Sequence, residues 1–172
     1  MKLRTMAIFA LLFGTSCKSQ DLPTVPELNL ERYQGTWYEI ARLPNRFEKG
    51  LSCISATYTI REDGRVTVEN RGVKAEGKES YIKGVAWVPN TDEPAKLKVR
   101  FFWPFAGNYW VISLDENYQY ALVGEPKRKY MWILSKTKTL DTQTFDKLKL
   151  IAKQKGFDVD KLIMVNQDCN KN

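Results

Sequence analysis

Three cysteines and the lack of histidine set the chemistry that this chain can do. Cys17, Cys53 and Cys169 carry its thiols, and none of the 172 residues is a histidine. Because histidine is the usual general base and a frequent zinc or haem ligand, most hydrolytic and metal-assisted mechanisms are removed. There is also no Walker loop and no Gly-x-Ser-x-Gly nucleophile elbow. We expect no catalytic residues, no metal and no cofactor, and therefore no enzyme.

Residues 1–17 have the pattern of a bacterial export signal. Lys2 and Arg4 precede an apolar run, residues 6–13, that is too short to span a bilayer. Small residues then lead to Cys17 as in a lipobox, although Gly14 stands where that motif usually has leucine. The pattern predicts a signal peptide over residues 1–17 and lipidation of Cys17, for example with palmitate. An ordinary signal peptide cleaved nearby is the alternative.

The segment after Cys17 indicates where the protein would be anchored. Residues 18–27 are predicted to be a tether, kept extended by Pro23 and Pro26. Lys18 follows the cysteine in place of the aspartate that would resemble an inner-membrane retention signal. Several acyl chains on one residue give stable anchoring. We therefore expect an outer-membrane, lipid-anchored protein whose folded domain covers residues 28–172. Both the periplasmic and the surface face of that membrane are compatible with the pattern.

The net charge does not indicate a nucleic-acid partner. The chain carries 27 Lys and Arg against 20 Asp and Glu, a formal charge of +7. These cations are spread along predicted strands and loops, and no zinc-finger, helix-turn-helix or RNA-recognition signature is present. We expect no nucleic acid among the partners.

Alternating polar and apolar residues, separated by turn signals, run through the chain from Trp37 onward. In residues 96–101 the cations face one way and the apolar residues the other, and Asp63-Gly64 is a hairpin signal. After the strand at Trp37, further strands are predicted at residues 52–60, 66–71, 80–88, 96–101, 108–114, 118–123 and 130–136. Because the connections are short, sequential strands should pair antiparallel. This predicts an all-β, eight-stranded antiparallel up-and-down barrel.

One helix and one last strand follow the predicted barrel. Asp141 or Thr142 can cap the helix and Gly156 can end it. Its apolar stripe consists of Phe145, Leu148, Ile151 and Ala152. A helix that comes after the strands can pack only outside the barrel. The last strand is predicted at residues 161–166.

Three segments, in order, resemble the motifs of the lipocalin family. They are Gly35-Thr36-Trp37-Tyr38 within residues 28–50, the segment Leu114-Asp115-Glu116-Asn117-Tyr118-Gln119-Tyr120, and Trp132-Ile133-Leu134-Ser135-Lys136-Thr137. The resemblance covers roughly residues 28–167 and is greatest to bacterial outer-membrane, apolipoprotein D-like lipocalins. It implies a barrel closed at one end by Trp37, with Gly35, Asp115, Tyr118 and Lys136 as further motif residues. Lys136 stands where the family has arginine stacked on the tryptophan.

The resemblance also implies what the cysteines do. In apolipoprotein D-like members, cysteines at positions matching Cys53 and Cys169 are bridged. If Cys17 is acylated, these two are the thiols that remain. The alternative is that Cys53 is a catalytic thiol, as in the isomerase branch of the family.

Strand alternation, together with the ligand positions of the family, predicts the lining of a cavity. The resemblance places Phe47 at its mouth. The other expected ligand-binding residues are Ala56, Tyr58, Val68, Asn70, Ile82, Val99, Phe101, Tyr109, Val111, Tyr130 and Trp132. Ala56, Gly84 and Ala86 should leave room inside. Such an apolar, aromatic lining suits an acyl chain or a flat apolar molecule. A barrel filled by its own side chains is the alternative.

The two ends of the predicted barrel differ in charge. Cations outnumber carboxylates in the loops of the open end, whereas carboxylates prevail in the turns of the closed end. The open end also carries an aromatic run at residues 102–105. We expect a membrane-anchored lipid-binding protein that holds a lysophospholipid or fatty acid for storage, transport or envelope maintenance. The alternatives are a lipocalin-type isomerase that uses Cys53, or a filled-barrel interaction module.

Overall fold

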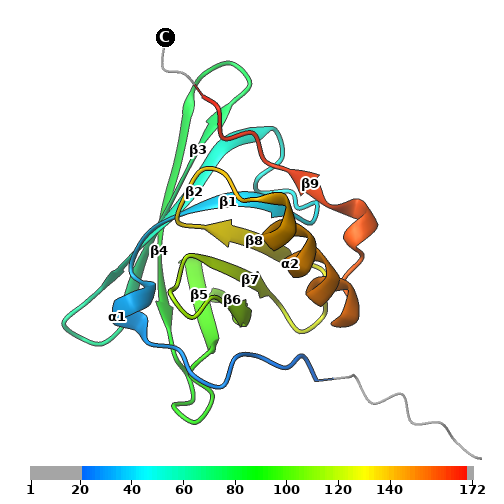
Figure 1. The fold of residues 1–172 in the computed structure, drawn as a ribbon. Helices are drawn as coiled ribbons and strands as arrows, with labels where there is room; N and C mark the ends of the chain where they lie inside the picture. Colours follow the sequence, from blue (N-terminus) through cyan, green and yellow to red (C-terminus); the bar gives the residue numbers. More distant parts are fainter. Residues whose placement is uncertain (1–20, 170–172) are drawn as a thin grey trace, which may run out of the picture.

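Eight antiparallel strands form a closed barrel in the structure, a computed structural model that describes residues 21–169 (Figure 1). The elements are α1 (Leu30–Tyr33), β1 (Gly35–Arg42), β2 (Leu51–Ile60), β3 (Val66–Lys74), β4 (Glu79–Trp87), β5 (Lys96–Phe102), β6 (Phe105–Leu114), β7 (Tyr120–Gly124), β8 (Met131–Ser135), α2 (Thr142–Gln154), the short 3-10 helix η1 (Val159–Lys161) and β9 (Ile163–Met164). Consecutive strands pair from β2 to β8, which confirms the predicted up-and-down order.

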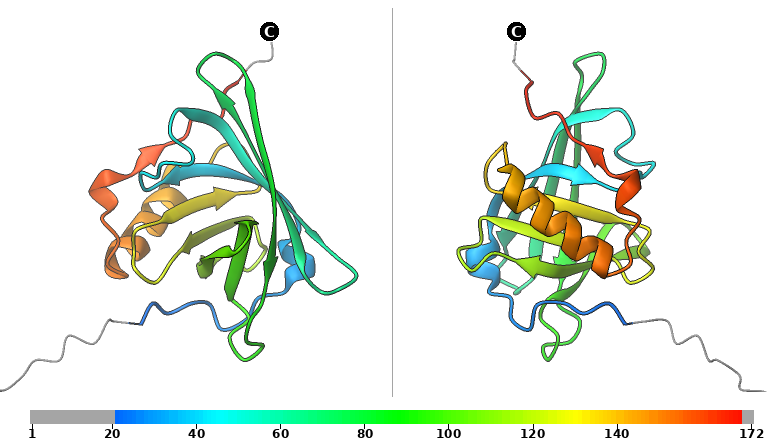
Figure 2. Two further views of the ribbon diagram at one scale, coloured as in Figure 1. Left: turned by 180° about the vertical axis from the view of Figure 1, so that it is seen from behind. Right: turned by 45° about the vertical axis from the view of Figure 1, so that its right-hand side comes forward.

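Strand β1 closes the barrel because it pairs with strands on both sides. Its first half, Gly35 to Tyr38, lies against β2, and its second half lies against β8 and β9. A register shift between Glu39 and Ala41 separates the two halves. Every residue from Ile40 to Leu43 is buried, because β9 and α2 cover the outer face of this half (Figure 2).

The second motif forms a turn before β7, and because of this turn β7 begins later than alternation predicted. Asp115 accepts hydrogen bonds from the backbone N–H groups of Asn117 and Gln119, at 3.1 and 3.2 Å. Tyr118 takes a left-handed backbone conformation with φ of 60°. Since such a turn cannot continue a strand, β7 begins at Tyr120 and not at Tyr118, where alternation predicted it.

Helix α2 packs on the outer face of the barrel, as predicted (Figure 2). The Asp141 carboxylate caps its first turn by accepting the N–H of Thr144 at 2.9 Å. Leu148 and Ala152 are fully buried against outward-facing residues of β6, β7 and β8. Gly156 then ends the helical segment with φ of +86°.

The segment predicted to be a tether is attached to the barrel over its described part. The Leu22 side chain is fully buried in the cluster under α2. The N–H of Val25 donates to the carbonyl of Val111 at 3.0 Å. The tether predicted for residues 18–27 is therefore corrected, because residues from Leu22 onward belong to the folded body. The predicted signal peptide and Cys17 lie outside the described residues.

The three motifs meet at the closed end of the barrel around Trp37. This side chain is fully buried, stacks on the Tyr33 ring at 4.7 Å and donates its indole N–H to the Tyr33 carbonyl at 2.8 Å. Lys136 Nζ lies 4.4 Å from the centre of the Trp37 ring and donates to the Gln34 carbonyl. Gly35 has φ of +88°, and a Cβ added there would lie 3.6 Å from Lys136 Nζ. Lysine thus occupies the position of the family arginine.

The second motif contributes to the closed end through Tyr118. Its hydroxyl accepts the N–H of Asn29 at 3.0 Å, and the Arg32 guanidinium lies 4.2 Å from the centre of its ring. The N–H of Lys136 donates to the Gln119 carbonyl at 2.8 Å. The hydrogen bonds therefore tie the second motif to the segments that contain the other two.

The C-terminal tail crosses β1 and β2 and is fixed by a disulfide. Cys53 and Cys169 are bonded, at a sequence separation of 116. The buried Gln167 amide donates to the carbonyls of Glu39 and Ile54, both at 2.8 Å. A crosslink over so long a loop stabilises the folded state by about 5 kcal/mol in the chain-entropy model. The pairing implied by the family resemblance is present.

The replacement Lys136→Arg should raise the melting temperature. A planar guanidinium can stack on the Trp37 ring and still donate to the Gln34 carbonyl, whereas lysine offers a point charge. Lys136→Met, which keeps a similar stem without the charge, should lower the stability by about 1 kcal/mol. Thermal and urea unfolding measure both variants. An unchanged melting temperature in both would show that the residue does not stabilise the closed end.

Candidate ligand-binding cavity

A cavity of about 100 Å³ lies inside the barrel. Every strand from β1 to β8 except β7 contributes to its lining, as do α1 and the β1–β2 loop. The lining is mainly apolar and consists of Leu30, Tyr33, Glu39, Glu48, Ile54, Ser55, Ala56, Tyr58, Val66, Val68, Asn70, Ala86, Leu97, Val99, Phe101, Asn108, Tyr109, Trp132 and Leu134. An apolar, aromatic lining of this kind suits an acyl chain or a flat apolar molecule.

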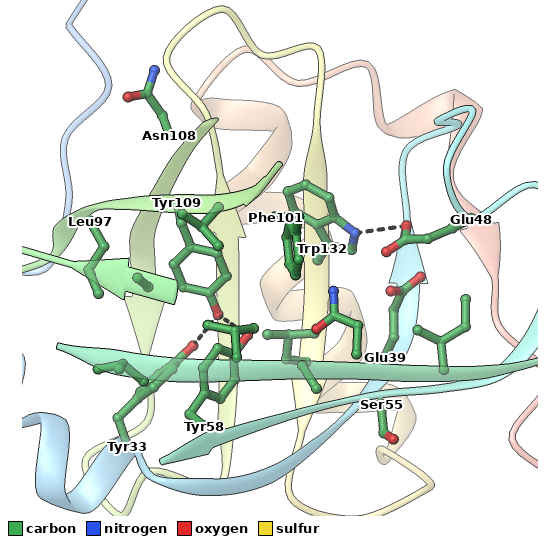
Figure 3. A pocket seen from close by; sticks show the side chains of 18 of the residues that line it. Tyr33, Glu39, Glu48, Ser55, Tyr58, Leu97, Phe101, Asn108, Tyr109 and Trp132 are labelled. Atoms are coloured by element: carbon green, nitrogen blue, oxygen red, sulfur yellow. Dashed lines mark hydrogen bonds between the residues drawn. The ribbon is translucent and has the colours of Figure 1, made fainter. Parts of the chain in front are cut away.

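Three tyrosines form the floor of the cavity above Trp37. The Tyr109 hydroxyl shares hydrogen bonds with those of Tyr33, at 2.8 Å, and Tyr58, at 2.9 Å (Figure 3). Burial raises the pKa of all three side chains, so they are neutral at physiological pH. Because the hydroxyls satisfy one another, the floor is polar without needing water.

The structure places eight of the predicted ligand-binding residues in this lining: Ala56, Tyr58, Val68, Asn70, Val99, Phe101, Tyr109 and Trp132. The other four lie elsewhere. Val111 is fully buried in the core at the closed end, and Ile82 is half-buried on β4 toward its turn with β3. The Tyr130 ring lies 6.2 Å from the Trp132 ring, and the Phe47 ring lies 5.2 Å from the Tyr130 ring. Binding of a ligand to these residues stays a prediction.

The space expected at Gly84 is occupied by an aromatic ring. A Cβ added at this position would lie 2.6 Å from the Phe101 ring and 2.7 Å from the Arg100 carbonyl. The absence of a side chain thus lets Phe101 pack against the β4 backbone. Gly84 therefore does not enlarge the cavity, whereas Ala56 and Ala86 do line it.

A buried charged cluster at one side of the cavity was not predicted from the sequence. Glu39 is 3% exposed and Arg42 4%, and Arg42 Nη1 donates to Glu39 Oε1 at 3.1 Å. Arg42 Nε lies 3.7 Å from Glu48 Oε2. The Trp132 indole N–H also donates to Glu48 Oε2, at 3.1 Å (Figure 3). The cavity therefore contains two carboxyl groups.

Sequence could have located one of these carboxyls. Glu39 lies two residues after Trp37 in the same strand, and alternation puts both on the inner face. Glu48 lies in the β1–β2 loop, where no periodicity applies. Burial, and then the neighbouring Glu48, raise the pKa of Glu39 well above its ordinary value, although Arg42 opposes this shift.

The open end combines exposed aromatic side chains with cations. Phe102, Trp103 and Phe105 at the β5–β6 hairpin are 69%, 81% and 79% exposed. Lys127 and Lys129 are exposed in the β7–β8 loop. Arg128 between them instead donates to the carbonyls of Lys155 and Pro126, at 3.0 and 2.6 Å. Arg128 thus joins this loop to the end of α2.

Two features are absent from residues 21–169. No group of three or more acidic or cysteine side chains in this range is placed to hold a metal ion. No helix in the same range has the length and apolar character needed to cross a membrane.

Comparisons with known proteins agree with this geometry. The lipocalin-like domain family matches residues 28–167. Outer membrane lipoprotein Blc of Citrobacter freundii is 42% identical over 167 residues, covering 94% of each chain. Apolipoprotein D of Macaca fascicularis is 35% identical and covers 98% of this chain and 96% of its own. Insecticyanin of the tobacco hornworm Manduca sexta has a TM-score of 0.69 at 26% identity, covering 85% and 84% of the two chains.

These relatives bear on the localisation as well as on the fold. Several carry the name outer membrane lipoprotein, among them those of Citrobacter freundii and Escherichia coli, which confirms the outer-membrane, lipid-anchored localisation. The matched region includes all three motifs at the closed end and the whole cavity lining. The chain belongs to the lipocalin family.

Proposed function

We propose that this protein is a non-enzymatic lipid-binding lipocalin that holds one amphiphile, a lysophospholipid or a fatty acid, in its barrel. It does so for storage, transport or maintenance of the cell envelope. The observation that carries the proposal is the narrow apolar cavity, closed by a tyrosine floor and a buried tryptophan. An acyl chain fills such a space and removes apolar surface from water, which stabilises the complex by about 0.8 kcal/mol for each buried methylene.

The charge of the open end supports an anionic head group. Lys127 and Lys129 are exposed there, next to Tyr130, whose ring lies 5.3 Å from Lys129 Nζ. A phosphate or carboxylate held at this rim stays hydrated and meets cations, while its chain lies inside.

Chain length supports a position close to the membrane. If Cys17 carries the lipid anchor, only residues 18–20 separate it from Asp21, and Leu22 is already buried. A fully extended chain covers about 3.5 Å per residue, so Asp21 lies within about 14 Å of the anchored cysteine. The aromatic side chains at residues 102–105 are suited to the interface of such a membrane.

The role of Cys53 argues against the isomerase alternative. A catalytic thiol must be free, whereas Cys53 is bonded to Cys169. Cys53 is also absent from the cavity lining. The exposed Phe102, Trp103 and Phe105 favour a second candidate, an interaction module that binds a surface through this hairpin and carries no ligand.

Filling the cavity should separate these two candidates. Ala56→Phe puts a ring into the space for the acyl chain and should weaken binding of a fluorescent fatty acid at least about tenfold. Thr59→Phe adds the same ring to the outer face of the same strand and should leave binding unchanged. Fluorescence titration measures both. Equal affinity of wild type and Ala56→Phe, or no binding by wild type, would favour the interaction module.

Removing the rim cations should weaken binding of anionic ligands in a salt-dependent way. Lys127→Gln with Lys129→Gln should lower the affinity for a fatty acid several-fold at low ionic strength and less at high salt. Lys138→Gln with Lys147→Gln removes the same charge far from the mouth and is the control. Arg128 is left in place because it holds the loop to α2. The same loss in both double variants would assign the effect to net charge and remove the rim from the proposal.

A further inference from the structure

One buried acceptor in the cavity lining, the side-chain oxygen of Asn70, has no hydrogen-bond donor among residues 21–169. We propose that Asn70, in the cavity lining that also contains the carboxyls of Glu39 and Glu48, forms an internal subsite that accepts a hydrogen bond from a neutral hydroxyl group on the bound amphiphile. The inference rests on the proposed function, since it names a chemical group of the ligand in the same cavity.

Asn70 is the residue that carries this inference. Its side chain lines the cavity, and its Oδ1 atom is buried with no hydrogen-bond partner among residues 21–169. A buried amide oxygen without a partner has lost its hydrogen bonds to water without replacing them, which destabilises the empty cavity. An acyl chain that passes Asn70 has no hydrogen-bond donor, whereas a hydroxyl group has one.

The neighbouring donors are already engaged. The Trp132 indole N–H donates to Glu48, and the amide of Asn45 donates to the same carboxylate oxygen. Arg42 donates to the Glu39 carboxyl and to the Glu48 backbone carbonyl. One exception is Arg42 Nε, a buried donor without a hydrogen bond that lies 3.7 Å from Glu48 Oε2. Among residues 21–169, Asn70 Oδ1 is the buried side-chain acceptor that lacks a partner.

The charge of the cluster excludes an anionic group from the same place. Two carboxyls face one guanidinium, so the cluster carries at most zero net charge when Glu39 holds a proton and is negative otherwise. Burial, and then the neighbouring Glu48, raise the pKa of Glu39, and both effects disfavour a further negative charge in this cluster. A carboxylate or phosphate should therefore stay at the lysines of the rim, and a neutral donor should occupy the subsite.

The test compares ligands that differ only in the donor. Medium-chain primary alcohols and the methyl ethers of the same alcohols displace a fluorescent fatty acid from the full chain, and the ratio of their dissociation constants is measured. Because the ether is the less polar molecule, an apolar cavity alone would favour it. We expect wild type to bind the alcohol more tightly, relative to the ether, than an apolar cavity alone would. Asn70→Leu should reduce the ratio of the alcohol affinity to the ether affinity by about three- to tenfold.

Asn70→Gln is the matched variant, because it keeps an amide oxygen acceptor without adding a charge. It should retain the preference for the alcohol. An unchanged ratio in Asn70→Leu, or a wild type that favours the ether as an apolar solvent does, would overturn the subsite while leaving lipid binding intact. A wild type that does not bind the fluorescent fatty acid at all would overturn the proposed function itself. Thermal unfolding of each variant confirms that the barrel is formed.

Discussion

Burial of Trp37 is the interaction on which the rest of the barrel depends. Its ring packs between Tyr33 and the Lys136 ammonium, and its N–H is satisfied by a backbone carbonyl. Because one side chain fills the end of the barrel, the eight strands can surround a space without leaving a channel through it. The residues of all three motifs serve this closure, so their spacing along the chain reflects one contact cluster and not the ligand.

Above this plug the interior is graded in polarity. The tyrosine hydroxyls satisfy one another at the floor, apolar side chains from β2 to β5 surround the middle, and buried carboxyls lie higher on the side of β1. Exposed lysines stand at the rim. From the apolar middle to the rim, this order matches that of an amphiphile from tail to head. The proposed function rests on this match between the lining and an amphiphile.

Much of this architecture could be predicted from the sequence. Alternation located all eight strands, because each has one face in the core, and the Asp141 cap and Gly156 marked the helix. The same alternation identified eight lining residues. It could not show that the Phe101 ring occupies the space at Gly84, because that depends on side-chain packing between strands. It also missed Glu48, which a loop brings inside, and the packing of Leu22, which a proline-rich segment gave no reason to expect.

The central claim is that the barrel holds one lipid when the protein is at work. Native mass spectrometry of the protein, extracted in mild detergent from the membrane in which it is made, tests this most directly. The account predicts a bound single-chain amphiphile at one copy per chain, released on denaturation and identified by its mass. An empty barrel that also takes up no lysophospholipid or fatty acid from vesicles would contradict it.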